Sequence, residues 1–284
     1  AQLLAQYSGA QGDPLLETLR AAATDLHAIP LTGEQLDWVA RLRTPEYSAF
    51  WRECTAAIAA LDAEQLEAFE LRHAAGVRWA SMHRPELLMK DRKALMAEVE
   101  TRVDAAKHYW RTGGSSTQPD EILRRAKDDL VWGDLVLMLA ALDALEDEAL
   151  AAELFEQAEK DKNDTSTEHG GVLDALASPA GAPRVLEFVA WPYPPRPSQR
   201  LGDMRFVASD DLISAGAPAL FHYHFHAPFY DNREYAGPSL ADLEYARQFG
   251  RSCLVFTFVS RDRLNADYYQ PNGARVDIGT IERP

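Results

Sequence analysis

The sequence changes its periodicity near residue 163, and this change limits the chain to folds that join a helical part to a sheet. Before that point apolar residues recur three and four positions apart, as at Leu36, Val39 and Leu42, which is typical of helices. After it, short apolar runs alternate with turn residues, which is typical of strands. The pattern predicts an α+β chain, with an all-helical domain over residues 1–163 and an α/β domain over residues 164–284.

Capping residues and turn residues predict where the elements begin and end. Thr32 and Asp62 are expected helix N-caps. Further helices of the first part are expected over 15–23 and 47–61, then one long helix over 85–110, another starting at Pro119, and one over 143–162. No fixed-period repeat is evident.

The second part is expected to contain several strands and two capped helices. The strands are expected at 171–176, 184–191, 204–208, 219–225 and 252–260, with a later hairpin turning at 272–273. Ser209 is expected to cap one helix, and the other is expected to run from its cap Ser239 to Gly250.

Three histidines occupy alternate positions of one expected strand. His222, His224 and His226 therefore point to the same face of the sheet. Asp242 falls in the first turn of the following helix, facing the end of that strand. Two imidazoles and one carboxylate leave a fourth position open, as in catalytic zinc sites.

Two of these assignments have competing interpretations. A shifted pair of His222 and His224 is an alternative to His224 and His226, although we expect His222 to be a supporting or core residue. Ser239 and Asp242 also match a helix capping box, in which the two residues satisfy each other's backbone amides.

The order of these residues along the chain is similar to the motif of a known family. His224 and His226, followed by Ser239 and Asp242, resemble the His-x-His and Ser-x-x-Asp motif of JAMM (JAB/MPN-type) zinc metalloproteases. The segment around Glu168 is similar to the one that carries the glutamate of that family. The sequence departs from the family in having Ala227 before the proline and a longer loop after His226.

The resemblance implies a fold, a cofactor and a role for each residue. It implies an α/β/α fold with a mixed, curved sheet and a Zn²⁺ ion held by His224, His226 and Asp242. Glu168 would be the general base and acid, and Ser239 would donate a hydrogen bond to the oxyanion.

Glu187 is the alternative to Glu168. Glu187 lies in an apolar strand pattern, where an unpaired buried carboxylate is costly, so it is expected to face outward. Glu168 precedes Gly170 and Gly171, which allow a close approach of the backbone.

These residues and the resemblance together imply zinc-dependent hydrolysis of a peptide or isopeptide bond. The expected substrates are proteins or peptides, ubiquitin-like proteins among them. The alternatives are a non-catalytic JAMM-like scaffold and a zinc hydrolase of a non-peptide substrate. The loop over 230–235 is expected to contact the substrate. The helical domain is expected to recognise a protein, cover the cleft or form a homo-oligomer.

Charge and composition exclude several other classes. A net charge of −15 and a pI of about 4.9 oppose binding to nucleic acids and to anionic membranes. Cys54 and Cys253 are too few and too far apart for a disulfide framework or a cysteine zinc site. No apolar run is long enough to span a bilayer, and no leader is visible, so the expectation is a soluble cytoplasmic protein, with export as the alternative.

Overall fold

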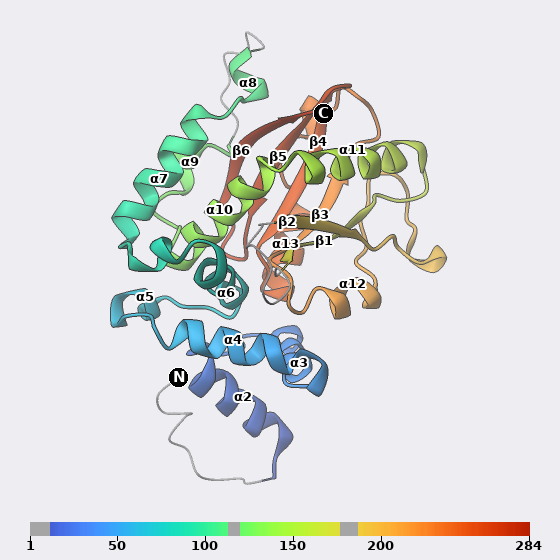
Figure 1. The fold of residues 1–284 in the computed structure, drawn as a ribbon. Coiled ribbons are helices and arrows are strands. Elements are labelled where there is room, and N and C mark those ends of the chain that lie inside the picture. Colours follow the sequence, from blue (N-terminus) through green and yellow to red (C-terminus); the bar gives the residue numbers. More distant parts are fainter. Residues whose placement is uncertain (1–11, 113–119, 177–186) are drawn as a thin grey trace.

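The computed structural model describes residues 12–112, 120–176 and 187–284, and it has a mixed α+β fold (Figure 1). Most of the helices precede residue 164, and the strands follow it. The helices of the first part are α2 Pro14–Asp25, α3 Gly33–Leu42, α4 Ser48–Ile58, α5 Ala63–Glu67, α6 His73–His83, α7 Arg92–Ala105, α8 Tyr109–Thr112, α9 Leu123–Ala126, α10 Trp132–Leu145 and α11 Glu148–Asn163. Short 3₁₀ turns lie at η1 Pro45–Tyr47 and η2 Pro85–Met89.

The second part forms one mixed sheet of six strands in the order β2-β1-β3-β4-β5-β6. Its strands are β1 Gly170–Leu176, β2 Glu187–Pro192, β3 Phe221–His226, β4 Cys253–Ser260, β5 Arg263–Tyr269 and β6 Arg275–Glu282. Strands β3 and β4 run parallel, and the other neighbours are antiparallel. Between the strands lie η3 Pro197–Gln199, α12 Asp210–Ala215, η4 Arg233–Tyr235 and α13 Leu240–Phe249.

Several expected boundaries are confirmed by hydrogen bonds. The side chains of Thr32, Asp62, Ser209 and Ser239 each accept a hydrogen bond from the third residue of the helix that they cap. Helix α13 ends at Gly250, whose φ of 64° lies in the left-handed region. The turn between β5 and β6 likewise contains Gly273 at a φ of 89°.

Two expected helices differ from the structure, because a capping aspartate interrupts each of them. The helix over 85–110 is divided into η2, α7 and α8, and Asp91 caps α7. The helix expected over 143–162 is found as α11 from Glu148 onward, with Asp147 as its cap, and its first residues form the end of α10. Pro119, where another helix was expected to start, lies outside the described residues, and α9 begins at Leu123.

The expected strand at 204–208 is also wrong. This segment has no regular structure, and the backbone amide of Glu168 donates to the carbonyl of Arg205 at 3.2 Å in place of a continuous ladder. The ring of Phe206 stacks on that of His224, with centroids 5.5 Å apart. The apolar residues that suggested a strand therefore cover one end of the histidine strand.

The two faces of the sheet are covered by different helices. Tyr223 and Phe225 point away from the histidines into the main core, where the hydroxyl of Tyr223 donates to Gln157 of α11. Helices α10 and α11 lie on this face, whereas α12 and α13 pack against the histidine face (Figure 1). Helices α10 and α11 share one hydrophobic core with the sheet, so the residues before and after 163 are packed together. The division into two domains therefore stays a prediction.

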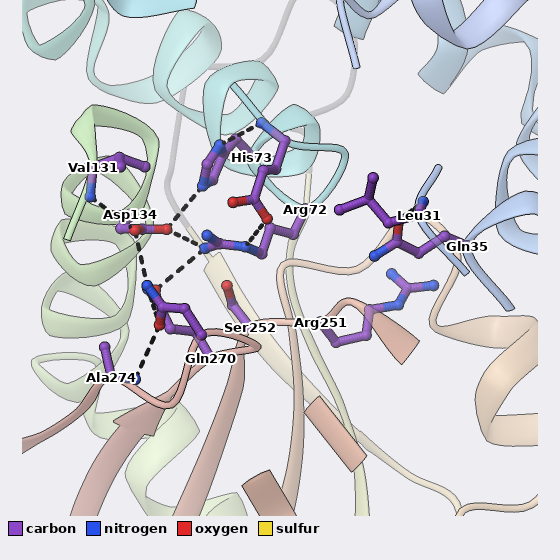
Figure 2. Close-up of polar contacts among 12 residues, drawn as sticks. Leu31, Gln35, Arg72, His73, Val131, Asp134, Arg251, Ser252, Gln270 and Ala274 are labelled. Carbon is purple, nitrogen blue, oxygen red and sulfur yellow. Dashed lines mark hydrogen bonds and ion pairs between the residues drawn. The ribbon is translucent and has the colours of Figure 1, made fainter. Parts of the chain in front are cut away.

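A buried charged cluster joins the helices to the end of the sheet. Figure 2 shows Arg72, His73, Asp134 and Gln270 pointing toward one another. Asp134 pairs with Arg72 and accepts hydrogen bonds from Nε2 of His73 at 2.8 Å and from Gln270 at 3.1 Å. The exposed fractions of Arg72, His73 and Asp134 are 4%, 1% and 0%, so each of these polar groups depends on the others.

The outer edges of strands β2 and β6 are partly hydrogen-bonded to neighbouring segments. On β2, the amides of Phe188 and Ala190 donate to Asp147 and Glu153, and Gln157 donates to the carbonyl of Ala190. On β6, the amides at 277 and 280 donate to the carbonyls at 121 and 107. In the described part of the chain, no helix is long and apolar enough to cross a membrane.

Candidate metal centre

Two histidine side chains converge at the end of β3. The Nε2 atoms of His224 and His226 lie 3.1 Å apart, and the exposed fractions of the two residues are only 3% and 8%. Strand β3 ends at His226, so the two imidazole rings lie at the border of the sheet rather than in its centre. The expected orientation of these histidines toward one point is therefore found in the structure.

Asp242 approaches both histidines from the first turn of α13. Its Oδ1 lies 3.3 Å from Nε2 of His224, and its Oδ2 lies 3.5 Å from Nε2 of His226. The same Oδ2 accepts the backbone amide of Ser239 at 2.7 Å, and Ser239 Oγ accepts the amide of Asp242 at 3.3 Å. The capping box is confirmed, and the carboxylate that it fixes is also directed at the two imidazoles, while its role as a metal ligand stays a prediction.

Glu168 comes from the segment that leads into β1. Ligand atoms of Glu168, His224 and His226 all lie within 4.8 Å of one another. The two glycines of β1 permit this approach: a Cβ on Gly170 would lie 2.4 Å from the carbonyl oxygen of Tyr223, and one on Gly171 would lie 2.0 Å from that of Trp191. Close backbone packing at this point requires glycine.

Glu187 lies away from the centre. It begins β2 and pairs with Leu176, which is the last residue of β1, whereas Gly170 at the other end of β1 pairs with His224. The side chain of Glu187 is exposed. The structure therefore brings Glu168, and not Glu187, to the histidines.

His222 is buried but does not join the cluster. Its Nδ1 lies 2.6 Å from the hydroxyl of Tyr245, and its Nε2 lies beside Gly216, where a Cβ would come within 2.2 Å. Burial, together with the charge of Arg251, lowers the pKa of His222 well below its ordinary value. His222 is a neutral core residue, as expected, and the shifted pair with His224 is not formed.

The spacing of the donor atoms fits one metal ion. Two ligands about 2.1 Å from a tetrahedral ion are about 3.4 Å apart. The two Nε2 atoms lie 3.1 Å apart, and the nearest carboxylate oxygens of Asp242, a different one for each histidine, lie 3.3 and 3.5 Å away. Nδ1 of His226 lies 2.9 Å from the carbonyl oxygen of Tyr235, which can only accept, so Nδ1 carries a hydrogen and Nε2 is the ring nitrogen that faces Asp242.

The electrostatics of the centre also favour a cation. Burial opposes ionisation of Asp242, yet His224 and His226 hold the pKa of its carboxyl far below the usual range. Burial likewise opposes the charge of His226, but Asp242 and Glu168 raise the pKa of that imidazole to about 9. Burial raises the pKa of Glu168, which makes it a better proton acceptor than an ordinary carboxylate.

Ser239 and the flanking loop border a cavity beside these ligands. The cavity has a volume of about 280 Å³ and is lined by Glu168, His226, Asp242 and Ser239 together with residues of the loop after β3. Ser239 is exposed, and its hydroxyl accepts the Asp242 amide. No acceptor for the hydroxyl hydrogen of Ser239 is found among the described residues, so this hydrogen is free to be donated to a bound molecule.

Several residues that were not predicted from the sequence contact the candidate ligands or the segments that carry them. Phe206 covers the ring of His224, and the carbonyl of Tyr235 orients His226. Asp161 is a third such residue, and its exposed fraction is only 4%. No local signal in the sequence marks it, because its partners are backbone amides of the segments next to β1 and β3.

Asp161 connects the backbones of the two segments that carry site residues. It accepts the amide of His169, next to Glu168, and hydrogen bonding from the amide of Ala227, next to His226, stabilises its charge. Burial nevertheless raises the pKa of Asp161 to about 8. Asp161 thus joins the segments of Glu168 and His226, in addition to the hydrogen bond from the Phe225 amide to the His169 carbonyl at 3.0 Å.

Replacing Asp161 with alanine is expected to weaken zinc binding by about tenfold or more, since outer partners of metal ligands typically contribute this much. Competition with a chromophoric chelator measures the affinity. Glu156→Ala, on the exposed side of α11, is the control and is expected to bind as the wild type does. Equal affinities for Asp161→Ala and the wild type would show that the contact does not position the ligands.

Comparison with known proteins gave no further identification: no family model, no curated protein and no solved structure matches this chain.

Proposed function

We propose that this chain is a zinc-dependent hydrolase of amide bonds, of the JAMM type. The observation that carries the proposal is the convergence of three side chains: the Nε2 atoms of His224 and His226 lie 3.1 Å apart, and each lies 3.3 or 3.5 Å from one oxygen of Asp242. The sequence order of Glu168, the two histidines, Ser239 and Asp242 supports the family assignment. His224, His226 and Asp242 would hold the ion, which would supply a water molecule activated near neutral pH.

The residues around the ion then have separate roles. Glu168, whose pKa is raised by burial, accepts the proton of the water and passes it to the leaving amine. Ser239 borders the same cavity and donates its hydroxyl hydrogen to the developing oxyanion. Asp242, already fixed by its capping bonds, needs no rearrangement to act as a ligand.

Two alternatives make different predictions. A JAMM-like scaffold protein would bind no metal and cleave nothing. A zinc hydrolase of another substrate class would bind the metal but cleave esters or phosphoesters in preference to peptides. A panel of peptide, ester and phosphoester substrates separates this second alternative from the proposed function.

Metal content is the first test of the proposal. The wild type is expected to bind about one zinc per chain, and Asp242→Ala is expected to lose it, because two histidines alone are a poor zinc site. Mass spectrometry under native conditions measures the stoichiometry. Glu244→Ala, on the exposed side of α13, controls for changes in that helix and is expected to keep the metal.

Absence of zinc from the wild type, even after zinc is supplied, would contradict the proposal. The capping box of Ser239 and Asp242 would then be only a helix start, and the scaffold alternative would be favoured.

A further inference from the structure

The cavity beside the metal centre has one side of mixed apolar and acidic character. Besides the metal-centre residues, its lining includes Met204, Glu234 and Tyr235. Exposed fractions of 50% for Met204 and 53% for Tyr235 are high for such large side chains. An exposed apolar surface at the border of a cavity is typical of a binding site.

Apart from His226, the charged side chains that line this cavity are carboxylates. None of the residues that line the cavity is Lys or Arg. Glu168 and Asp242 face the metal centre, so Glu234 is the carboxylate of the lining that remains for a ligand. In the described residues Glu234 forms no ion pair, whereas the neighbouring Arg233 is held by Asp231 at 2.7 Å.

The loop that carries Glu234 is fixed to the metal centre. Asn232 donates from its side chain to the carbonyl of His226 at 3.1 Å and from its amide to the carbonyl of Phe258 at 2.8 Å. Tyr235 accepts the Nδ1 hydrogen of His226. Glu234 therefore lies between two anchored residues, and its backbone has a defined position relative to His226.

We infer that the site acts on polypeptides with a Lys or Arg next to the cleaved amide, and that Glu234 recognises this basic side chain. Met204 and Tyr235 would cover the aliphatic stem, and the carboxylate of Glu234 would pair with the charged group. The net charge of −15 adds a general attraction for cationic segments. This inference rests on the proposed function, since it names the substrate of the same site.

Cleavage of a peptide library by the zinc-loaded protein tests the inference. Mass spectrometry of the products is expected to find Lys or Arg enriched next to the cleaved bond. Matched peptides with Lys, Gln or Glu at that position then give ratios of kcat/KM. Glu234→Gln is expected to lower the preference for Lys over Glu about tenfold, and Glu234→Lys is expected to reverse it. Glu244→Gln, which removes the same charge from α13, is expected to keep the preference of the wild type.

A binding measurement separates this inference from the proposed chemistry. Fluorescence anisotropy of labelled Lys and Glu peptides is measured on Glu168→Gln and on the double variant Glu168→Gln/Glu234→Gln. Tighter binding of the Lys peptide, lost in the double variant, supports the inference even where the wild type cleaves nothing and the hydrolase proposal fails. Cleavage or binding without any preference between Lys and Glu peptides would overturn the inference and leave the hydrolase proposal standing.

Discussion

Glu168→Gln is expected to lower kcat about a thousandfold while zinc remains bound. The change removes the proton acceptor but keeps the size of the side chain, and general acid–base groups typically contribute 10²–10⁴ in rate. The metal is expected to stay because the proposed ligands are His224, His226 and Asp242, which the change leaves in place. Steady-state kinetics on a cleaved peptide and zinc analysis on the same preparation provide the two measurements.

Glu187→Gln is the matched control for this experiment. It makes the same chemical change at the exposed start of β2, away from the centre, so activity is expected to equal that of the wild type. A fully active Glu168→Gln would exclude Glu168 as the proton acceptor. Loss of zinc in Glu168→Gln would instead make Glu168 a ligand, as its approach to both histidines within 4.8 Å permits.

Asp134→Ala is expected to lower the free energy of unfolding by about 3–5 kcal/mol. The change leaves the guanidinium of Arg72 buried without its main partner, and it removes the acceptor of the His73 Nε2 hydrogen. His73 has no alternative partner on its other nitrogen, since Nδ1 already accepts the amide of Glu70. Chemical denaturation, followed by circular dichroism, measures the change.

Two further variants identify the cause of the lower free energy of unfolding. Asp262→Ala removes an exposed aspartate and is expected to change the free energy of unfolding by less than about 0.5 kcal/mol. The double variant Arg72→Met/Asp134→Leu is expected to regain much of the stability, because it removes the uncompensated charge. A loss below about 1 kcal/mol in Asp134→Ala would show that water or another group replaces the carboxylate.

The local features of the fold could be predicted from the sequence because they depend on neighbouring residues. Alternation along β3 places His224 and His226 on one face, and the spacing of Ser239 and Asp242 sets a capping box. Together these give three candidate ligands on a segment of about twenty residues. The approach of Glu168 follows from the pairing of β1 with β3, which the sequence suggested only through a resemblance.

The errors have a common physical origin. The apolar spacing continues through Asp91 and Asp147, so periodicity alone joins helices that these residues separate as caps. The segment at 204–208 has the composition of a strand but packs its Phe206 ring on His224. Asp161 has the polarity of a surface residue, and only the three-dimensional arrangement supplies the amides that compensate its burial.

The outer strands of the sheet have a consequence for how a polypeptide can bind. An exposed strand edge invites another chain to add itself as a further strand, in recognition or in aggregation. On β2 the amides of Phe188 and Ala190 already donate to α11, and on β6 two amides donate to the segments around Lys107 and Glu121. Strand addition at either margin would first have to break these bonds. The sheet is thereby protected against edge-to-edge association, and a polypeptide ligand must be held by side chains and loops.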